Sequence, residues 1–483
     1  MNSQVNKIIY HEIDFLLPIH RFNIRFTYVT KKGFPFIREF LLRLVHISPM
    51  LPSQLGMYFG LSKRELDEAL SDLMDKGDLL FTPSGQVALT AQSKGYFVGL
   101  GSTPLLSTIL ESGAALSFEL SSFSCIGRGR TNDRWNSGVK LRVDNQIVSQ
   151  SEMLAKNSFQ NQFYEILDNG YLPSVREEGT NRPSIYTIDS VSKLGAEPLR
   201  LSTKLFIDID GKPVERNDYD ELNDSSSVQE LVTNAISELE RPTNIPQLAQ
   251  AMNELGDNWT RKLFNDNSVN VEKFIQIRTE AILNDKNPIP FIGPIYTAHN
   301  WQVLSEKLDA SAKKLSKNRS PNGSNLIWIA PSDNFWGKSI RLNSCLSELI
   351  LESFTKEKNP RQVYMPKLFV PLRDKLDKYS ANQWKSDLND YLDYLYGLTE
   401  GFLDGNVEII LLPDEVVVVC YHFTFAAVLP VTIPVGFIST DPEIINKAQQ
   451  VVNKYINGIK SNEQYNNLGP LKTLIEKTKD TVN

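Results

Sequence analysis

Residues 34–97 constrain the fold more than any other stretch of this chain. Apolar residues recur at helical spacing in three consecutive segments of the stretch. Ser62 and Glu65 form a Ser-x-x-Glu capping box at the start of the third segment. Two short apolar runs, 79–82 and 86–90, then flank a Pro-Ser-Gly turn, as the strands of a hairpin do. The stretch is therefore predicted to form three helices followed by a hairpin.

The segments LPSQLGMYFGLSKRELDEALSDLMDKGDLL and VALTAQSKGYF give this stretch a resemblance to winged helix-turn-helix domains. The resemblance implies that the third helix enters the major groove of double-stranded DNA through its N-terminus, where Lys63 and Arg64 lie. It also implies a wing hairpin that includes Gln86. Many such domains contact proteins instead, and the stretch carries six basic and seven acidic residues. Both interpretations therefore stay open.

The charge of the whole chain restricts how it can bind nucleic acid. The net charge is −6 and the pI is about 5.6, so any contact with DNA must come from a local basic patch. Three widely separated cysteines form no Cys-x-x-Cys pair, which favours reduced thiols and predicts neither a zinc site of local spacing nor any cofactor. No signal peptide and no membrane helix are expected, because no apolar run approaches the roughly 20 residues that a span needs. We therefore expect a cytoplasmic protein.

Shifts in pattern divide the chain into five expected parts, and the expected fold class is multidomain α+β and α/β. The parts are a leading strand segment (1–33), the winged helix (34–100), a β-rich domain with a Gly/Arg loop (101–216), a linker and helical connector (217–288), and a C-terminal α/β domain (289–483).

Within the C-terminal part, three details of the pattern give specific expectations. Helices are predicted over about 380–403. The run 428–433 contains a proline and is predicted to be an edge strand at best. Gly436 is predicted to form a turn before the next helix.

A second candidate DNA contact is the Gly/Arg loop. Its cations are Arg128, Arg130 and Arg134, with Lys140 on the following strand, and the segment 118–142 has a net charge of +3. Such a loop could contact the DNA backbone and stack a base on the tryptophan that follows Arg134. The alternative is an ordinary hairpin loop whose arginines pair with carboxylates.

A third candidate lies in the C-terminal part. Lys338 and Arg341 follow Phe335-Trp336, just beyond a strand that ends near Asp333. Ligands often bind at strand ends of α/β sheets, and two cations with two aromatic rings could hold a nucleic-acid backbone. A solvated loop explains the same residues equally well.

The segments GPIYTAHNWQVLSEKLDASAKKL and NLIWIAPSDN resemble the opening of phospholipase D-like domains. The resemblance implies a catalytic histidine with a lysine two residues later, but Trp301 follows His299 at that spacing and Thr424 follows His422. It therefore implies an inactive enzyme. Phosphate-loop, zinc-protease and nucleophile-elbow motifs are also missing.

The pair Asp208 and Asp210 fits a turn better than a metal site. A scattered metallonuclease site that also includes Glu215 is an alternative.

The leading hypothesis is a non-enzymatic, DNA-associated component of a larger prokaryotic assembly, such as an antiviral defence system, with double-stranded DNA and proteins as partners. One alternative is a nuclease or phosphodiesterase with a divergent site in the C-terminal part. The other is a protein-interaction adaptor that never contacts nucleic acid.

Overall fold

The chain folds into two compact units, each built from separate stretches of sequence. The α/β unit comprises 1–18, 131–143 and 198–483, and the ribbon unit comprises 19–130 and 144–197. The computed structural model describes residues 7–100, 102–131, 133–176, 182–214, 225–239, 241–265, 268–284, 286–317, 324–355, 360–425, 428–460 and 464–476. This division differs from the five consecutive segments expected from the sequence, because long strands begin in one unit and end in the other.

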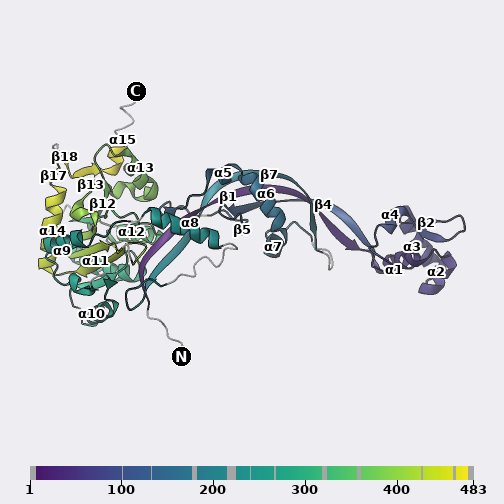
Figure 1. Cartoon of the computed structure of the whole chain (residues 1–483), viewed down its shortest axis with the longest axis horizontal. Coiled ribbons are helices and arrows are strands. Elements are labelled where there is room, and N and C mark those ends of the chain that lie inside the picture. The colour runs from purple at the N-terminus through teal and green to yellow at the C-terminus, as the bar shows by residue number, and fades with distance from the viewer. Residues whose placement is uncertain are drawn as a thin grey trace, which may run out of the picture. The chain divides into compact units, whose positions relative to one another are not determined.

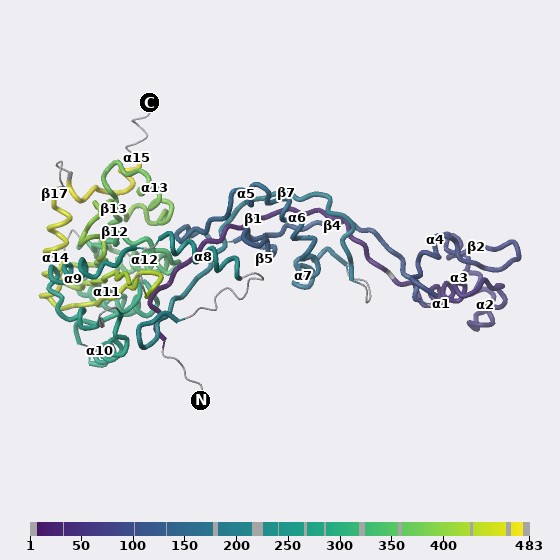
Figure 2. Tube along the Cα trace, in the orientation of Figure 1, coloured from purple at the N-terminus to yellow at the C-terminus, as the bar shows by residue number. Residues whose placement is uncertain are grey.

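The ribbon unit is built on two long strands. β1 (Ile8–Gly33) pairs antiparallel with β4 (Leu105–Glu119), from Ile19 opposite Glu119 to Gly33 opposite Leu105. β7 (Ser184–Ile207) runs along the other side of β1, and β5 (Cys125–Gly127) pairs with β4 (Figure 2). Most of the leading strand segment expected at 1–33 is thus one 26-residue strand.

One face of this sheet is covered by helices. Phe26 of β1 packs against Phe159 and Phe163, with ring centroids 5.0 and 6.0 Å apart. His20 lies on the same buried face. Its pKa is lowered to about 4, mainly because the imidazole is buried and to a smaller extent because Lys193 is positively charged. The covering helices are α6 (Ser151–Asn161) and α7 (Phe163–Asp168), and the short helix α5 (Asn145–Ser149) precedes them (Figure 1). Since side chains alternate along a strand, the neighbouring residues of β1 point to the opposite, open face.

The helical module of the ribbon unit follows β1 in sequence. Its elements are α1 (Phe36–Ile47), α2 (Pro52–Phe59), α3 (Lys63–Asp75), β2 (Leu79–Phe81), β3 (Val87–Leu89) and α4 (Ala91–Lys94). The Ser62 backbone N–H donates to a Glu65 carboxylate oxygen at 2.9 Å, and the Glu65 N–H donates to Ser62 Oγ at 3.4 Å. The predicted capping box and the predicted order of three helices and a hairpin are confirmed.

The α/β unit contains a mixed sheet of eight strands in the order β10-β16-β15-β14-β11-β12-β13-β19. β11, β12 and β13 are parallel neighbours, and the other neighbours are antiparallel. The strands are β10 (Ile289–Ile292), β11 (Ser324–Ile329), β12 (Tyr364–Leu372), β13 (Leu395–Thr399), β14 (Val407–Leu412), β15 (Val416–Phe423), β16 (Ile433–Ser439) and β19 (Asn467–Pro470).

Helices pack on both faces of this sheet and make two hydrophobic cores. Ile409 of β14 belongs to the core that includes Val452, and its neighbour Ile410 belongs to the core that includes Trp301. The helices of the unit are α8 (Ser225–Glu238), α9 (Ile245–Leu255), α10 (Val271–Leu283), α11 (Ala298–Lys317), α12 (Ile340–Glu352), α13 (Lys378–Asp387), α14 (Pro442–Ile456) and α15 (Leu471–Glu476). The short elements are η1 (Thr260–Leu263), η2 (Asn389–Tyr394), η3 (Phe402–Gly405), β6 (Val139–Lys140), β8 (Phe264–Asn265), β9 (Ser268–Val269), β17 (Ile459–Lys460) and β18 (Gln464–Tyr465). The chain is therefore a mixture of helices and several sheets.

Three expectations for the C-terminal part are wrong. The stretch 380–403, expected to be helical, contains the buried strand β13. No strand covers 428–432, and β16, which begins at Ile433, is internal because it lies between β10 and β15. Gly436 lies inside β16 instead of in a turn, and a Cβ there would overlap the Val419 carbonyl oxygen. Close backbone contact, not turn geometry, explains this glycine.

Candidate functional site

The first predicted contact lies in the helical module. Lys63 and Arg64 are exposed at the N-terminus of α3, and neither has a carboxylate partner among the described residues. By contrast, Arg38 and Lys76 both form ion pairs with Asp72. Gln86 is half-buried in the β2–β3 hairpin, where its side-chain oxygen accepts a hydrogen bond from Ser84 Oγ at 3.2 Å. Lys63 and Arg64 are thus available together at one end of α3.

The Gly/Arg loop is divided between the two units. Arg128 and Arg130 belong to the ribbon unit, and Arg134 and Lys140 belong to the α/β unit; all four are exposed. Trp135 is only 5% exposed and packs in a core of the α/β unit. The expectation that this tryptophan stacks on a base is therefore wrong, and the loop offers cations alone.

The open face of the ribbon sheet carries further cations that the sequence analysis missed. Arg21, Arg25 and Lys31 point to this face, because each occupies an odd-numbered position of β1. Arg25 and Lys31 are exposed, and a half-buried Arg21 donates from Nη2 to the Arg128 carbonyl oxygen at 3.4 Å. Arg128 and Arg130 therefore lie next to the end of this row.

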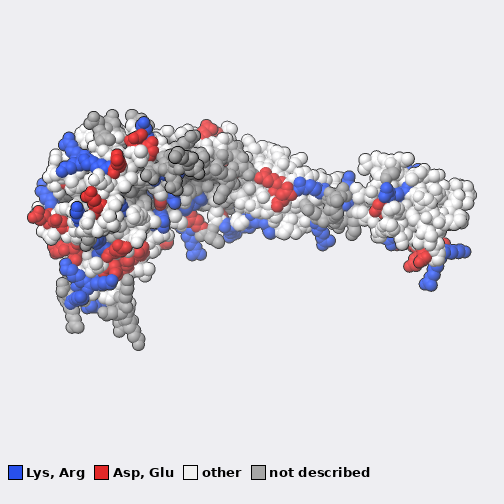
Figure 3. Space-filling view, turned by 90° about the horizontal axis from the view of Figure 1, so that it is seen from below, with Lys and Arg blue, Asp and Glu red and all other residues white. Residues whose placement is uncertain are grey.

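Small residues of β4 lie beside this row of cations. Gly113 is opposite Arg25 and Ser117 is opposite Arg21. Two acidic groups also lie on the face: Glu111 opposite Thr27, and Asp189, which accepts a hydrogen bond from Thr27 Oγ1 at 3.1 Å. Figure 3 shows both cationic and acidic groups over the ribbon sheet.

We call the five cations of this region the ribbon cations: Arg21, Arg25, Lys31, Arg128 and Arg130. Arg21, Arg25 and Lys31 lie on the open face with Glu111 and Asp189, and Arg128 and Arg130 are exposed beside its end, so the region as a whole is locally positive. The signal was present in the sequence, since residues 21–28 alternate between polar and apolar.

The third predicted contact is neutralised by neighbouring carboxylates. Lys338 forms an ion pair with Asp387 at 2.6 Å, and Arg341 lies 3.9 Å from Glu12. The two aromatic residues expected to assist them, Phe335 and Trp336, are each 1% exposed. The expected use of these rings for nucleic-acid contact is therefore wrong.

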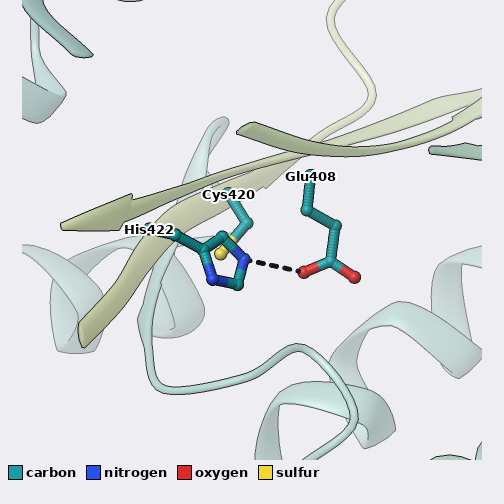
Figure 4. Close-up of side chains that lie close together, drawn as sticks. All are labelled: Glu408, Cys420 and His422. Carbon is teal, nitrogen blue, oxygen red and sulfur yellow. Dashed lines mark hydrogen bonds and ion pairs between the residues drawn. The ribbon is translucent and has the colours of Figure 1, made fainter. Parts of the chain in front are cut away.

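A cluster of buried polar residues forms around His422 in the α/β unit. Glu408 of β14 is directly opposite Cys420 of β15, and His422 follows two residues later on the same face of the strand (Figure 4). The described residues contain no other group of three metal-ligating side chains this close, with all three ligand atoms within 4.8 Å of one another. All three residues are buried.

Asp333, just beyond β11, fixes one side of the His422 ring. Its Oδ2 lies 2.8 Å from His422 Nδ1 and accepts a hydrogen bond from Thr432 Oγ1 at 2.7 Å. Burial alone would raise the pKa of Asp333 and lower that of His422. Neighbouring groups outweigh burial at both residues. His422, followed by Thr432, holds the pKa of Asp333 below its usual range, and the charge of Cys420, followed by the hydrogen bond to Asp333, raises the pKa of His422 well above its usual value.

Glu408 is held from the other side by two tryptophans. The indole N–H groups of Trp328 and Trp336 donate to its Oε1 at 2.8 and 2.9 Å. Its Oε2 lies 3.4 Å from His422 Nε2.

The thiol of Cys420 is buried beside these two residues. Burial, the largest influence, raises the pKa of Cys420 to about 11.

The remaining acidic candidates show turn contacts. Asp208 Oδ1 accepts hydrogen bonds from the backbone N–H groups of Asp210 and Lys212, at 3.0 and 2.9 Å. Glu215, the third member of the alternative nuclease site, and most of the predicted linker at 217–226 lie outside the described residues.

A cleft of about 730 Å³ lies elsewhere in the α/β unit, among α9, η3 and α14. Its lining includes Glu254, Asp404, Lys447 and Lys454 but neither Asp333 nor His422. The buried cluster and the cleft are therefore separate features.

Comparison with known proteins adds no relative: no family model, curated protein or solved structure matches this chain. Among the described residues, no helix is both long and apolar enough to cross a membrane.

Proposed function

We propose that this chain binds double-stranded DNA without cleaving it, as one component of a larger assembly. The observation that carries the proposal is a set of cations in the ribbon unit that have no carboxylate partner among the described residues. The set comprises the five ribbon cations together with Lys63 and Arg64. Unpaired lysines and arginines supply most of the affinity for phosphate backbones.

The ribbon cations extend far enough to follow DNA. Arg21 and Lys31 are ten residues apart on one strand, which corresponds to about 33 Å of extended chain. One helical turn of B-DNA is about 34 Å long. Gly113 and Ser117 of β4, opposite Arg25 and Arg21, leave room there for a sugar-phosphate backbone.

The helical module supplies the second contact. Its order of helices and hairpin is that of a winged helix, and in that class the N-terminus of the third helix faces the bases. Lys63 and Arg64 lie at that end of α3. They are joined there by the backbone N–H groups of the first turn other than that of Glu65, which donates to Ser62 Oγ; such groups favour phosphate oxygens.

A gel-shift experiment tests this proposal. The full chain should shift duplex DNA at low salt, and Lys63→Glu with Arg64→Glu should weaken the shift, because each substitution reverses a charge. If no duplex binds at low salt and the double variant changes nothing, the proposal is wrong.

The buried acids favour binding over cleavage. Asp333 has no exposed side-chain surface and its Oδ2 is engaged by His422 and Thr432. A metal-dependent nuclease needs carboxylates that substrate can reach. Plasmid cleavage that Asp333→Ala abolishes would support the nuclease alternative instead.

A second candidate function, a protein-interaction adaptor, is favoured by the apolar surface of the helical module. Phe36 is 74% exposed, Met57 79% and Tyr58 70%. Exposed apolar groups of this size mark protein interfaces more often than DNA contacts. Met57→Ser with Tyr58→Ser should abolish co-purification of a protein partner but leave DNA binding unchanged if the module serves both roles.

A further inference from the structure

We propose that Glu408, Cys420 and His422 bind a structural zinc ion inside the α/β unit. This site is independent of the proposed DNA contact. The argument rests on the fold of β14 and β15, on the distances between the ligand atoms and on the groups that orient them.

The strand pairing brings the three ligands together. Glu408 and Cys420 are paired residues of neighbouring antiparallel strands, and His422 lies two positions further along β15. Side chains in these positions point to the same face of a sheet. A carboxylate oxygen, a thiol and an imidazole therefore converge, and this combination of donors suits zinc better than magnesium or calcium.

The distance between His422 and Glu408 fits an ion between them better than a direct hydrogen bond. A tetrahedral zinc about 2.1 Å from a nitrogen and an oxygen holds these two atoms about 3.4 Å apart. His422 Nε2 and Glu408 Oε2 are 3.4 Å apart. A charge-assisted hydrogen bond is usually shorter, about 2.7–2.9 Å, as on the other side of the ring, where Nδ1 and Asp333 are 2.8 Å apart.

The surrounding residues orient the ligands as the outer shell of a zinc site does. A metal-bound histidine usually gives its second ring nitrogen to a carboxylate, and here Asp333 occupies Nδ1 and leaves Nε2 for the ion. Trp328 and Trp336 hold Glu408 Oε1 and leave Oε2 facing the imidazole. These partners therefore leave His422 Nε2 and Glu408 Oε2 facing each other at the centre of the cluster.

Burial makes the role structural. Glu408 and Cys420 are 0% exposed and His422 is 1% exposed, so a substrate cannot reach the ion. Three protein ligands leave the fourth position of a tetrahedral ion to a further donor. The ion would tie β14 to β15 and, through Asp333, to the end of β11.

Metal analysis of the full chain, purified through a tag that does not chelate metals, tests the proposal. The expected result is one zinc ion per chain by mass spectrometry. Cys420→Ser should lose most of this zinc, whereas Cys345→Ser should retain it, because Cys345 is a buried free thiol in the same core that bonds to the Tyr296 carbonyl.

Cobalt substitution keeps the test decisive if Cys420→Ser does not fold. Wild-type protein stripped of metal and loaded with Co²⁺ should show a thiolate-to-cobalt charge-transfer band that Cys345→Ser also shows. Wild-type protein with neither zinc nor this band would overturn the proposal, as would a folded Cys420→Ser variant that holds as much zinc as the wild type.

Discussion

Neutralising the ribbon cations should reduce the salt dependence of DNA binding by a calculable amount. The logarithm of affinity falls with the logarithm of salt concentration with a slope of about −0.9 per neutralised phosphate. If all five ribbon cations contact phosphates, they contribute about −4.5 to the slope, which corresponds to about a 500-fold loss of affinity between 50 and 200 mM salt. The combined variant Arg21→Gln, Arg25→Gln and Lys31→Gln should leave a contribution of about −1.8, or about a 12-fold loss.

Fluorescence anisotropy with a labelled duplex of arbitrary sequence measures both slopes. The matched control replaces three exposed lysines of the α/β unit, Lys273, Lys375 and Lys378, with glutamine, which removes the same number of charges. The control should keep the wild-type slope, since none of its three lysines belongs to the ribbon unit that the proposal assigns to DNA. A ribbon variant whose slope equals that of the control would refute the assignment of this face to DNA.

Four further outcomes are expected elsewhere in the chain. Lys63→Gln with Arg64→Gln should reduce the salt slope by about 1.8 in the anisotropy assay, and an unchanged slope would remove α3 from the contact. Ser62→Ala should cost about 1 kcal/mol of unfolding free energy in urea denaturation, whereas no change would mean that the cap contributes nothing. Gly436→Ala should lower the melting temperature sharply, because its Cβ would overlap a backbone carbonyl; a wild-type melting temperature would contradict the packing of β16. His20 has a pKa of about 4 against an ordinary 6.5, so the unfolded state binds a proton that the folded state does not, and stability should fall as pH drops from 6.5 toward 4. His20→Gln should flatten this part of a melting-temperature profile, and an equally steep profile would show that another group is responsible.

Local chemistry made the helical module predictable from the sequence. A capping box, a glycine after a helix and a short turn each involve residues within about four positions, so the sequence shows them directly. The long strands were harder, because a proline at position 18 lies within β1 and divides the apparent pattern. β13 was missed because its neighbours in the chain are helical, and it becomes a strand only by pairing with β12 and β19.

In the candidate sites, too, contacts between residues that are distant in sequence could not be predicted. Glu408 and Cys420 lie on consecutive strands joined by a short turn, so their opposition follows from the register of one hairpin. Asp333 is 89 residues from His422 in sequence, and only the pairing of β11 with β14 brings them together. The ion pairs that neutralise Lys338 and Arg341 also join distant segments, which explains why these cations looked available from the sequence alone.

Cross-linking between the full chain and duplex DNA, followed by mass spectrometry of the cross-linked peptides, tests the central claim most directly. The account predicts that cross-links fall in peptides that contain Arg21–Lys31, Arg128–Arg130 and the start of α3, and that raising the salt concentration removes them. Cross-links confined to 198–483, or none at low salt, would contradict it.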